Sequence, residues 1–305
     1  KEENFILLTK NNDEVLSNIE NEKKNKKIKQ NVINMIAKYE KEWFSLIEKT
    51  RIIPDGKGAL KKLPLVHHLE APYLYYPITS QRCPEGETCV VFGQFVKVGE
   101  VIGTRKGAFF EQPIHSTVSG EVVGHEMKMD NSGKLVNCMI VKNDFKYELH
   151  ESIKTRSDEE IKNLTKADFV QIAKDAGLVG LGGSGFPTYI KLNTKSQIDI
   201  ILANGVECEP KLISDYEVMM NHPEELIIGL IYSMQAVGAK TGIIAVKKKY
   251  VEVIERINFA LNAYSDYDIR VVPVGNYYPQ GWELEAIKSA TGIVVPQGKL
   301  PGDYG

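Results

Sequence analysis

The stretch GLVGLGGSGFPTYIKL, residues 177–192, places four glycines within six positions. Glycine lets a backbone approach a flat or anionic ligand closely and turns N–H groups towards it. Gly180, Gly182 and Gly185 also fit G-x-G-x-x-G, which is typical of a dinucleotide loop when a strand precedes it and a helix follows. Here we expect a helix before the run and a strand after it, and no G-K-[ST] ending follows. The run, which also contains Gly183, therefore predicts a ligand-contacting loop of another kind, with a bare hinge as the alternative.

Two further polar clusters follow predicted strands. NGVECEP, residues 204–210, brings Glu207 and Glu209 directly after IDIILANG, and GNYYPQGWE, residues 275–283, follows YDIRVVPV. Ligands of parallel sheets bind outside the carboxyl ends of the strands. Together with the glycine run, these clusters predict one shared pocket. The alternative for the two glutamates is that they are solvated loop acids, because most Glu side chains are exposed.

The elements that must position these clusters alternate along residues 151–305. LTKADFVQIAKDAG has the pattern of a helix with Thr165 as N-cap, Asp168 three residues later and Gly177 as its stop. HPEELIIGLIYSMQAVGA is a helix that starts at Pro223, and TGIIAVK and YDIRVVPV are strands. Alternation of this kind predicts a parallel sheet with helices on both faces.

Residues 61–150 contain short apolar segments separated by glycines, among them GQFVKVGEVIG and PIHSTVSGEVVGHE, which predict a small barrel or sandwich. The pair resembles the barrel-sandwich fold of biotinyl and lipoyl carrier domains. EMKMD, around Lys128, resembles a biotin-attachment sequence, but it follows the second segment instead of lying between the two. The residues between Glu100 and Pro113 are too few for the lysine hairpin of a carrier. We therefore expect no covalent modification.

Residues 1–60 are expected to form a helical N-terminal extension that ends at the turn PDGKG, residues 54–58. Apolar residues recur at helical spacing from Ile28 to Leu46. The lysines within residues 23–27 are more simply a solvated face than a membrane-surface patch.

Composition excludes several classes of protein. A net charge of −2 argues against a general nucleic-acid binder, and no apolar run reaches the roughly 18 residues that a membrane-spanning helix needs. The first residues carry no apolar signal core, so a cytoplasmic protein is expected. The four cysteines, Cys83, Cys89, Cys138 and Cys208, lack the spacing of zinc or iron–sulfur ligands. We expect them to bind no metal cluster.

Three motifs, in order, carry a resemblance to a known family. GLGGSGFPTYIKL closely resembles the flavin loop GRGGAGFPTGLKW of the NADH-oxidising subunit of respiratory complex I. NGVECEP resembles that subunit's NADEGEP and is closer still to NGAECEP of the C subunit of the Rnf electron-transport complex, with Cys208 as the discriminating residue. YYPQG also resembles the Rnf-type loop. A near relative is the Rnf-C-like electron-transfer protein associated with proline reductase in clostridia. The resemblance covers Pro64 to Gly305.

The resemblance implies an α/β fold class: a barrel-sandwich β domain, residues 61–150, followed by a parallel-sheet, Rossmann-like domain that binds FMN and NADH, residues 151–305. It also implies a chain truncated before a β-grasp and a ferredoxin-like region, so that iron–sulfur clusters would lie beyond residue 305. The implied function is an NADH-oxidising, FMN-dependent subunit that passes electrons to iron–sulfur centres or a redox partner. Its partners would be other redox subunits or a reductase, without nucleic acid. It would be cytoplasmic and reach the membrane only through partner subunits.

By the same motifs, the residues assigned to the shared FMN and NADH cavity are Gly180, Gly182, Gly183, Gly185, Phe186, Lys191, Asn204, Glu207, Glu209, Tyr278, Gly281 and Glu283. The four glycines of the loop would line the isoalloxazine, and Phe186 would stack on an adenine or nicotinamide ring. Lys191 would meet the FMN phosphate or ribityl chain. Asn204 and Glu207 would hydrogen-bond the flavin, and Glu209 would face the nicotinamide ribose. The last three residues would close the opposite wall.

The sequence departs from the family pattern at several polar positions. Val179 and Leu181 stand where complex I has arginines, and Val206 stands where it has an aspartate. The Rnf-type D-D-R is D-Y-E here, beginning at Asp215. By the resemblance, each change removes a polar contact that could hold FMN or NADH. The alternative function is therefore a non-catalytic Rnf-C-like docking scaffold that has lost flavin.

Overall fold

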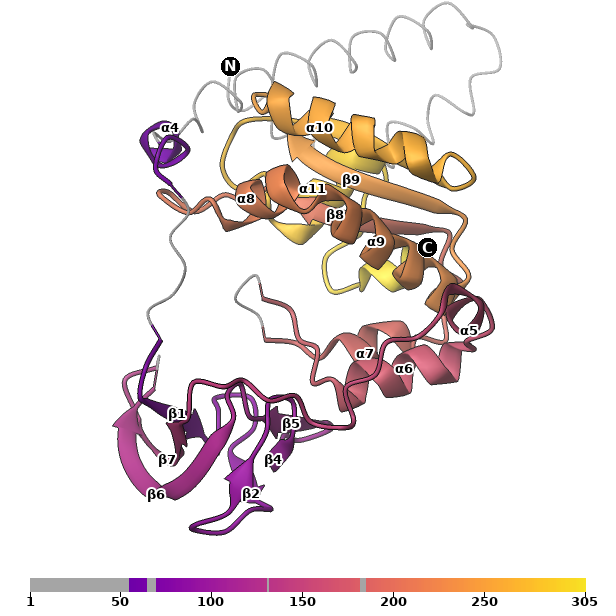
Figure 1. Ribbon diagram of the computed structural model, residues 1–305. Helices are drawn as coiled ribbons and strands as arrows, with labels where there is room; N and C mark the ends of the chain where they lie inside the picture. The colour runs from indigo at the N-terminus through magenta and orange to yellow at the C-terminus, as the bar shows by residue number, and fades with distance from the viewer. Residues whose placement is uncertain (1–54, 65–69, 131, 182–184) are drawn as a thin grey trace, which may run out of the picture.

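A computed structural model describes residues 55–64, 70–130, 132–181 and 185–305 (Figure 1). The helix expected between Ile28 and Leu46, the lysines of residues 23–27, and the loop glycines Gly182 and Gly183 lie outside these ranges. Within them, no helix has both the length and the apolar character that crossing a membrane requires.

Residues 73–143 form two antiparallel β-sheets (Figure 1). One sheet has the order β1-β7-β6-β3, made of Tyr73–Pro77, Leu135–Asn143, Gly120–Met129 and Phe95–Val96. The other has the order β2-β4-β5, made of Glu85–Thr88, Val101–Lys106 and Glu111–His115. Their shared core comprises Tyr76, Val90, Val96, Ile102, Ile114, Val118, Val122, Met139 and Val141. The glycine-separated apolar segments thus form a β unit, as predicted, with the apolar side chains between the sheets.

The residues between Glu100 and Pro113, too few for the lysine hairpin of a carrier, form most of a plain β-hairpin. β4 and β5 pair antiparallel, with Lys106 opposite Glu111. A four-residue turn, residues 107–110, joins the two strands. That turn contains no lysine. Lys128 lies on β6, where its ammonium is 2.8 Å from Glu126 Oε1 and 4.5 Å from the centre of the Tyr75 ring.

The second unit alternates helices and strands along residues 158–304. Its elements are α5 Asp158–Lys162, α6 Lys166–Asp175, α7 Thr188–Leu192, β8 Ile200–Gly205, α8 Ser214–Asn221, α9 Pro223–Val237, β9 Thr241–Lys247, α10 Val251–Leu261, η1 Asn262–Tyr264, β10 Asp268–Val274, α11 Glu283–Thr291 and η2 Pro301–Tyr304. The three strands are parallel in the order β10-β9-β8. This is the parallel sheet that the alternating pattern predicts.

Helices cover both faces of this sheet because successive side chains of a buried strand point to opposite sides. Ile244 and Val246 of β9 pack with α8, α9 and α10, whose buried side chains include Ile227 and Ile257. Ala245, between them in sequence, packs on the other face in a cluster that includes Ala290 of α11. The apolar run of β9 is therefore explained by burial on both sides.

The predicted start of α6 is confirmed in detail. The Thr165 hydroxyl accepts from the Asp168 amide, and the Asp168 carboxylate accepts from the Thr165 amide. Pro223 occupies the first turn of α9, also as predicted. The segment after Pro187 differs from expectation, because the helical turn α7 comes before the strand β8. Five residues are too few to show a helical period in the sequence.

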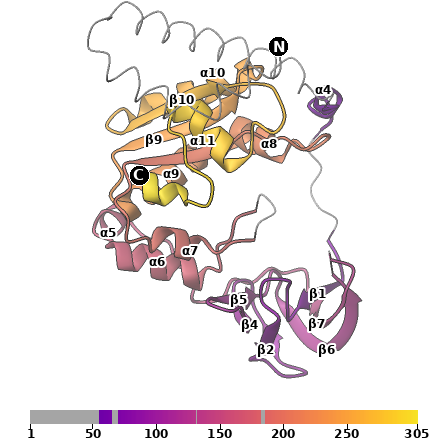
Figure 2. The same ribbon diagram turned by 180° about the vertical axis from the view of Figure 1, so that it is seen from behind.

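Residues 55–64 lie apart from the β unit that follows them in sequence. α4, Lys57–Leu60, sits beside α8 at the edge of the parallel-sheet unit, and both views show this (Figures 1 and 2). The β unit instead meets α6 and α7. There the Glu111 amide donates to the Tyr189 hydroxyl at 3.3 Å, and Lys174 lies 3.8 Å from the Glu111 carboxylate.

Candidate functional site

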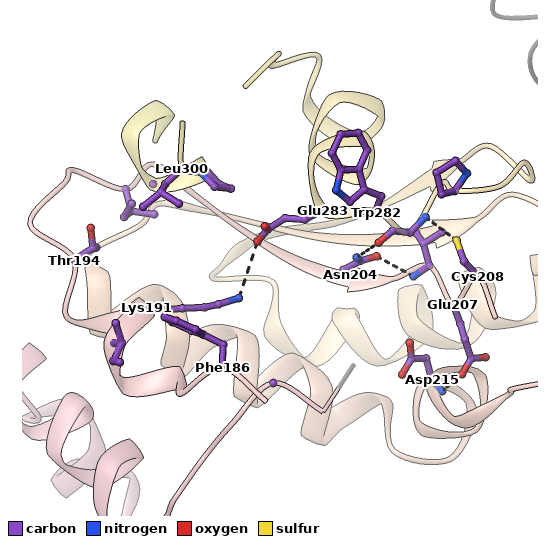
Figure 3. A pocket seen from close by; sticks show the side chains of 18 of the residues that line it. Phe186, Lys191, Thr194, Asn204, Glu207, Cys208, Asp215, Trp282, Glu283 and Leu300 are labelled. Carbon is purple, nitrogen blue, oxygen red and sulfur yellow. Dashed lines mark hydrogen bonds and ion pairs between the residues drawn. The ribbon is translucent and has the colours of Figure 1, made fainter. Parts of the chain in front are cut away.

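A cavity of about 1160 Å³ opens at the carboxyl end of β8. The residues predicted from the sequence that line it are Gly180, Phe186, Lys191, Asn204, Glu207, Glu209, Tyr278, Gly281 and Glu283. Gly185 belongs to the same loop but is not on the cavity wall. The structure therefore brings the three sequence clusters around one space. Figure 3 shows side chains reaching it from α7, the end of β8 and the start of α11.

The described ends of the glycine loop are joined by backbone hydrogen bonds. The Gly180 amide donates to the Phe186 carbonyl at 2.9 Å, and the Gly185 amide donates to the Gly180 carbonyl at 3.1 Å. Gly185 has φ +57°, a conformation that favours glycine, and a Cβ there would meet nothing within 4 Å. The glycine at 185 thus serves the turn of the backbone, and the space beside it is open.

Glu207 is buried on the cavity wall and already has three donors from the protein. Its Oε1 accepts from the Ser214 hydroxyl at 3.3 Å and the Asp215 amide at 3.2 Å. Its Oε2 accepts from the Lys57 ammonium at 3.2 Å, and the two side chains are 1% and 4% exposed. A carboxylate has about four lone-pair positions, so roughly one remains for a ligand.

A second buried lysine supports the same residue from the sheet. Lys247, at the end of β9, donates to the Glu207 carbonyl at 2.8 Å, and Lys57 donates to that carbonyl at 2.9 Å. Burial holds the pKa of Lys247 below its ordinary value; the Cys208 thiol opposes this shift and Lys57 adds to it. The acidic loop is therefore held from beneath by two ammonium groups.

The acidic loop is also latched to the segment before α11. Asn204 donates from Nδ2 to the Gly281 carbonyl at 3.0 Å and accepts from the Val206 amide at 3.1 Å (Figure 3). The Gly281 amide donates to Cys208 Sγ at 2.8 Å. A Cβ at Gly281 would lie 2.1 Å from the Val206 carbonyl oxygen, so only glycine permits this approach.

The cavity mouth carries an exposed ion pair between α7 and α11. Lys191 Nζ lies 4.0 Å from Glu283 Oε1, and both side chains are about 60% exposed (Figure 3). A pair this long and this exposed contributes little to stability. Lys191 is therefore available to exchange its carboxylate partner for another anion.

Several cavity residues were missed by the sequence reasoning. Asp215, which the sequence singles out only as a departure from the family pattern, lies on the wall, and its pKa is raised by burial and by the neighbouring Glu207. Arg82 reaches the same cavity from the β1–β2 connection, and Trp282 flanks the glycine latch. Lys57, which contacts Glu207 without lining the cavity, was assigned to a terminal extension. Asp215 and Trp282 stand beside recognised motifs, whereas no motif surrounds Arg82 or Lys57, and only the tertiary structure reveals the position of those two.

Among the residues that the structure describes, no group of three or more His, Cys, Asp or Glu could hold a metal ion. Cys83 and Cys138 are buried in the β unit, whereas Cys208 is the cysteine that reaches the cavity.

Two family descriptions match this chain in succession. Residues 52–146 match the RnfC barrel sandwich hybrid domain, and residues 173–305 match the Nuo51 FMN-binding domain. The C subunit of the Na(+)-translocating ferredoxin:NAD(+) oxidoreductase complex of Acetobacterium woodii is 31% identical over 85% of this chain and 55% of its own length. The chain belongs to the Rnf-C-like family. The resemblance drawn from the three motifs is thus confirmed.

Other proteins are similar to parts of this Rnf-C-like chain. The C subunit of the proton-translocating ferredoxin:NAD(+) oxidoreductase complex of Clostridium ljungdahlii is 31% identical over 80% of this chain and 50% of its own length. Cobalamin reductase PduS of Citrobacter freundii is 43% identical over 43% of this chain and 28% of its own length. A NAD+-reducing [NiFe]-hydrogenase structure aligns over 43% of this chain and 25% of its own with 23% identity and a TM-score of 0.39. The chain spans about half the length of the Rnf relatives.

Two of the family departures make contacts in this chain. Val206 is 4% exposed and packs with Ala245 and Val274 beneath the acidic loop. Val179 forms an isolated backbone bridge with Pro187 across the base of the glycine loop. Leu181, by contrast, is 93% exposed, and nothing in the described residues explains its type.

Proposed function

We propose that the cavity binds FMN and that this chain is the flavin-bearing part of an NADH-oxidising electron-transfer subunit with a Rossmann-like ligand-binding unit. The match of residues 173–305 to an FMN-binding domain supports the proposal. The observation that carries it is the convergence of the glycine-loop, acidic-loop and YYPQG residues on one cavity. The proposed partners are other redox subunits or a reductase. Binding to such subunits would place the protein at the cytoplasmic face of a membrane.

The residues present fit a flavin mononucleotide. Gly180 of the glycine loop lines the wall without a side chain, and Phe186 supplies an aromatic face there. Lys191 is an exposed cation at the mouth and suits the phosphate. Asn204 and the Glu207 loop would hold the polar edge of the ring, with Glu207 fixed by its three protein donors. Tyr278, Gly281 and Glu283 would close the opposite wall, and Glu209 would face the nicotinamide ribose.

The bound flavin would accept a hydride from NADH and release single electrons, and the chain supplies position and electrostatics. Asn204 joins the acidic loop to the YYPQG segment through its hydrogen bonds to Val206 and Gly281. The polar groups that would meet the edge of a ligand are thereby held in place. Phe186 and Trp282 add aromatic surface to a wall that also carries five acids.

A titration with FMN and riboflavin tests the proposal, because only FMN carries a phosphate. We expect saturable quenching of flavin fluorescence by the wild-type protein. Lys191→Ala should weaken FMN binding on the order of tenfold, or about 1.4 kcal/mol, and change riboflavin binding little. Lys195→Ala is the matched control, since Lys195 is exposed nearby but does not line the cavity.

If the wild-type protein shows no saturable FMN binding, the docking-scaffold alternative is favoured. If Lys191→Ala weakens FMN and riboflavin equally, the phosphate does not lie at Lys191.

A further inference from the structure

Residues 55–61, here called the strap, precede the β unit in sequence but contact the parallel-sheet unit. The Lys211 amide donates to the Asp55 carbonyl at 2.7 Å, and the Asp55 carboxylate pairs with Lys249. Burial acts to raise the pKa of Asp55, but the bonds from Lys249 and from the Lys57 amide together outweigh it, and the pKa lies below its ordinary value. The strap thus begins with an ionised carboxylate anchored beside α10.

The other end of the strap is anchored by a different interaction. Lys61 lies 2.8 Å from the Glu252 carboxylate, and its ammonium is 4.2 Å and 4.0 Å from the ring centres of Tyr216 and Tyr250. Both anchors rest on partly exposed groups. Between them, α4 brings Lys57 to a site that is 1% exposed.

Among the described residues, Lys57 is the donor to Glu207 Oε2. Its ammonium donates to both Glu207 Oε2 and the Glu207 carbonyl. Lys247 donates to the Glu207 carbonyl but not to Oε2. Burying an ammonium and a carboxylate is expensive, and removing one partner leaves an uncompensated charge. The pair joins residues that are 150 positions apart in sequence. A pair of this kind fixes geometry more effectively than it adds stability.

We propose that Lys57 is a positioning residue of the ligand cavity: the strap places its ammonium beneath the acidic loop, residues 204–210, and holds Glu207 at the wall. Lys57 does not line the cavity, so it acts through Glu207. The loop is bonded to the YYPQG segment through Asn204 and Cys208, so its displacement would disturb two walls. The consequence for FMN binding rests on the proposed function, whereas the consequence for the loop does not.

Lys57→Met tests the inference, because methionine fills a similar volume without the charge. We expect amide hydrogen exchange in residues 204–210 to speed up at least fivefold in the ligand-free protein. Lys61→Met is the matched control on the same strap, since Lys61 does not touch Glu207, and it should leave exchange in the loop unchanged. Unchanged loop exchange in a folded Lys57→Met protein would overturn the inference, whatever FMN does.

FMN supplies the second measurement. Lys57→Met should weaken FMN binding about tenfold and shift the absorption maximum of the bound flavin, whereas Lys61→Met should do neither. A folded Lys57→Met variant with wild-type FMN affinity and spectrum would also overturn the inference. Fast loop exchange in Lys57→Met with no FMN binding by the wild type would support the strap and count against the proposed function alone.

A double variant covers the case in which Lys57→Met fails to fold. Lys57→Met with Glu207→Gln replaces the ion pair by neutral groups and removes the unpaired buried charge, so folding should recover. The loop should still exchange fast, because the link to the strap is gone. Wild-type exchange in this double variant would contradict a positioning role for Lys57.

Discussion

Gly281 shows that a residue chosen for its resemblance to a flavin motif can have a packing reason of its own. A Cβ there would lie 2.1 Å from the Val206 carbonyl and 2.8 Å from Cys208 Sγ. The residue lines the cavity, but its type is dictated by the close approach of two loops. The sequence could predict that glycine matters here, whereas the reason depends on a contact with Cys208, which is 73 positions away along the chain.

Gly281→Ala should therefore destabilise the fold by about 1–3 kcal/mol, because the added methyl forces the loops apart. Gly229→Ala is the control, since a Cβ at Gly229 in α9 meets nothing within 4 Å and alanine favours a helix. That control should be neutral or slightly stabilising. Chemical denaturation measures the free energy of unfolding of both variants. Equal values would show that the two loops can separate enough at Gly281 to accommodate a methyl group.

Lys57 marks the limit of sequence reasoning at this scale. The glycines and acids of the cavity stand in motifs with recognisable spacing, so their convergence could be predicted. Lys57 lies in the turn PDGKG, where a lysine is ordinarily solvated. Its burial depends on α4 docking beside α8, which no local pattern encodes.

At the scale of elements, the parts with strong periodicity or caps were predictable. The helix α9, the strands β9 and β10 and the parallel sheet follow from apolar runs bounded by turn residues. The β4–β5 hairpin and α7 were not, because a four-residue turn and a five-residue helix leave little pattern. Both short elements lie near the contact between the two units, where tertiary packing decides the local structure.

The two capped helices α5 and α6 offer a test of how capping couples to packing. Each begins with a complete capping box, at Ser157 and Thr165, but α6 buries Phe169 and Ala173 whereas α5 buries no residue. Thr165→Ala should lower the free energy of unfolding by about 1 kcal/mol. Ser157→Ala should change it by less than about 0.3 kcal/mol, because α5 can fray without unfolding the core. Urea denaturation compares them; equal losses would mean that α5 unfolds with the rest of the unit.

At the scale of the whole molecule, the cavity draws on both units. Arg82 lines it from the β unit, and its carbonyl lies against the turn after β4, where a Cβ at Gly107 would come within 2.7 Å of it. The same turn leads to Glu111, which contacts Tyr189 of α7. The barrel sandwich is therefore placed to contribute to ligand binding as well as to support the fold.

Arg82 and Lys191 are the cations among the described residues of the cavity wall; the acids there are Glu207, Glu209, Asp215, Glu283 and Asp303. The phosphates of a nicotinamide dinucleotide are repelled by carboxylates, so they should lie towards the cations, and a guanidinium suits a phosphate well. Arg82→Ala should weaken NADH binding about five- to tenfold at low salt and less at high salt, where the Debye length shrinks from about 10 Å at 0.1 M to about 3 Å at 1 M.

Lys106→Ala is the control for Arg82→Ala, because Lys106 is a cation of the same unit that pairs with Glu87 and does not line the cavity. It should leave NADH binding unchanged at both salt concentrations. The measurement is quenching or enhancement of NADH fluorescence in a titration of the FMN-free protein, since bound flavin would react with NADH. Equal NADH affinities for Arg82→Ala and Lys106→Ala would mean that the barrel sandwich does not contact the nucleotide, and the dinucleotide would then be held by the parallel-sheet unit alone.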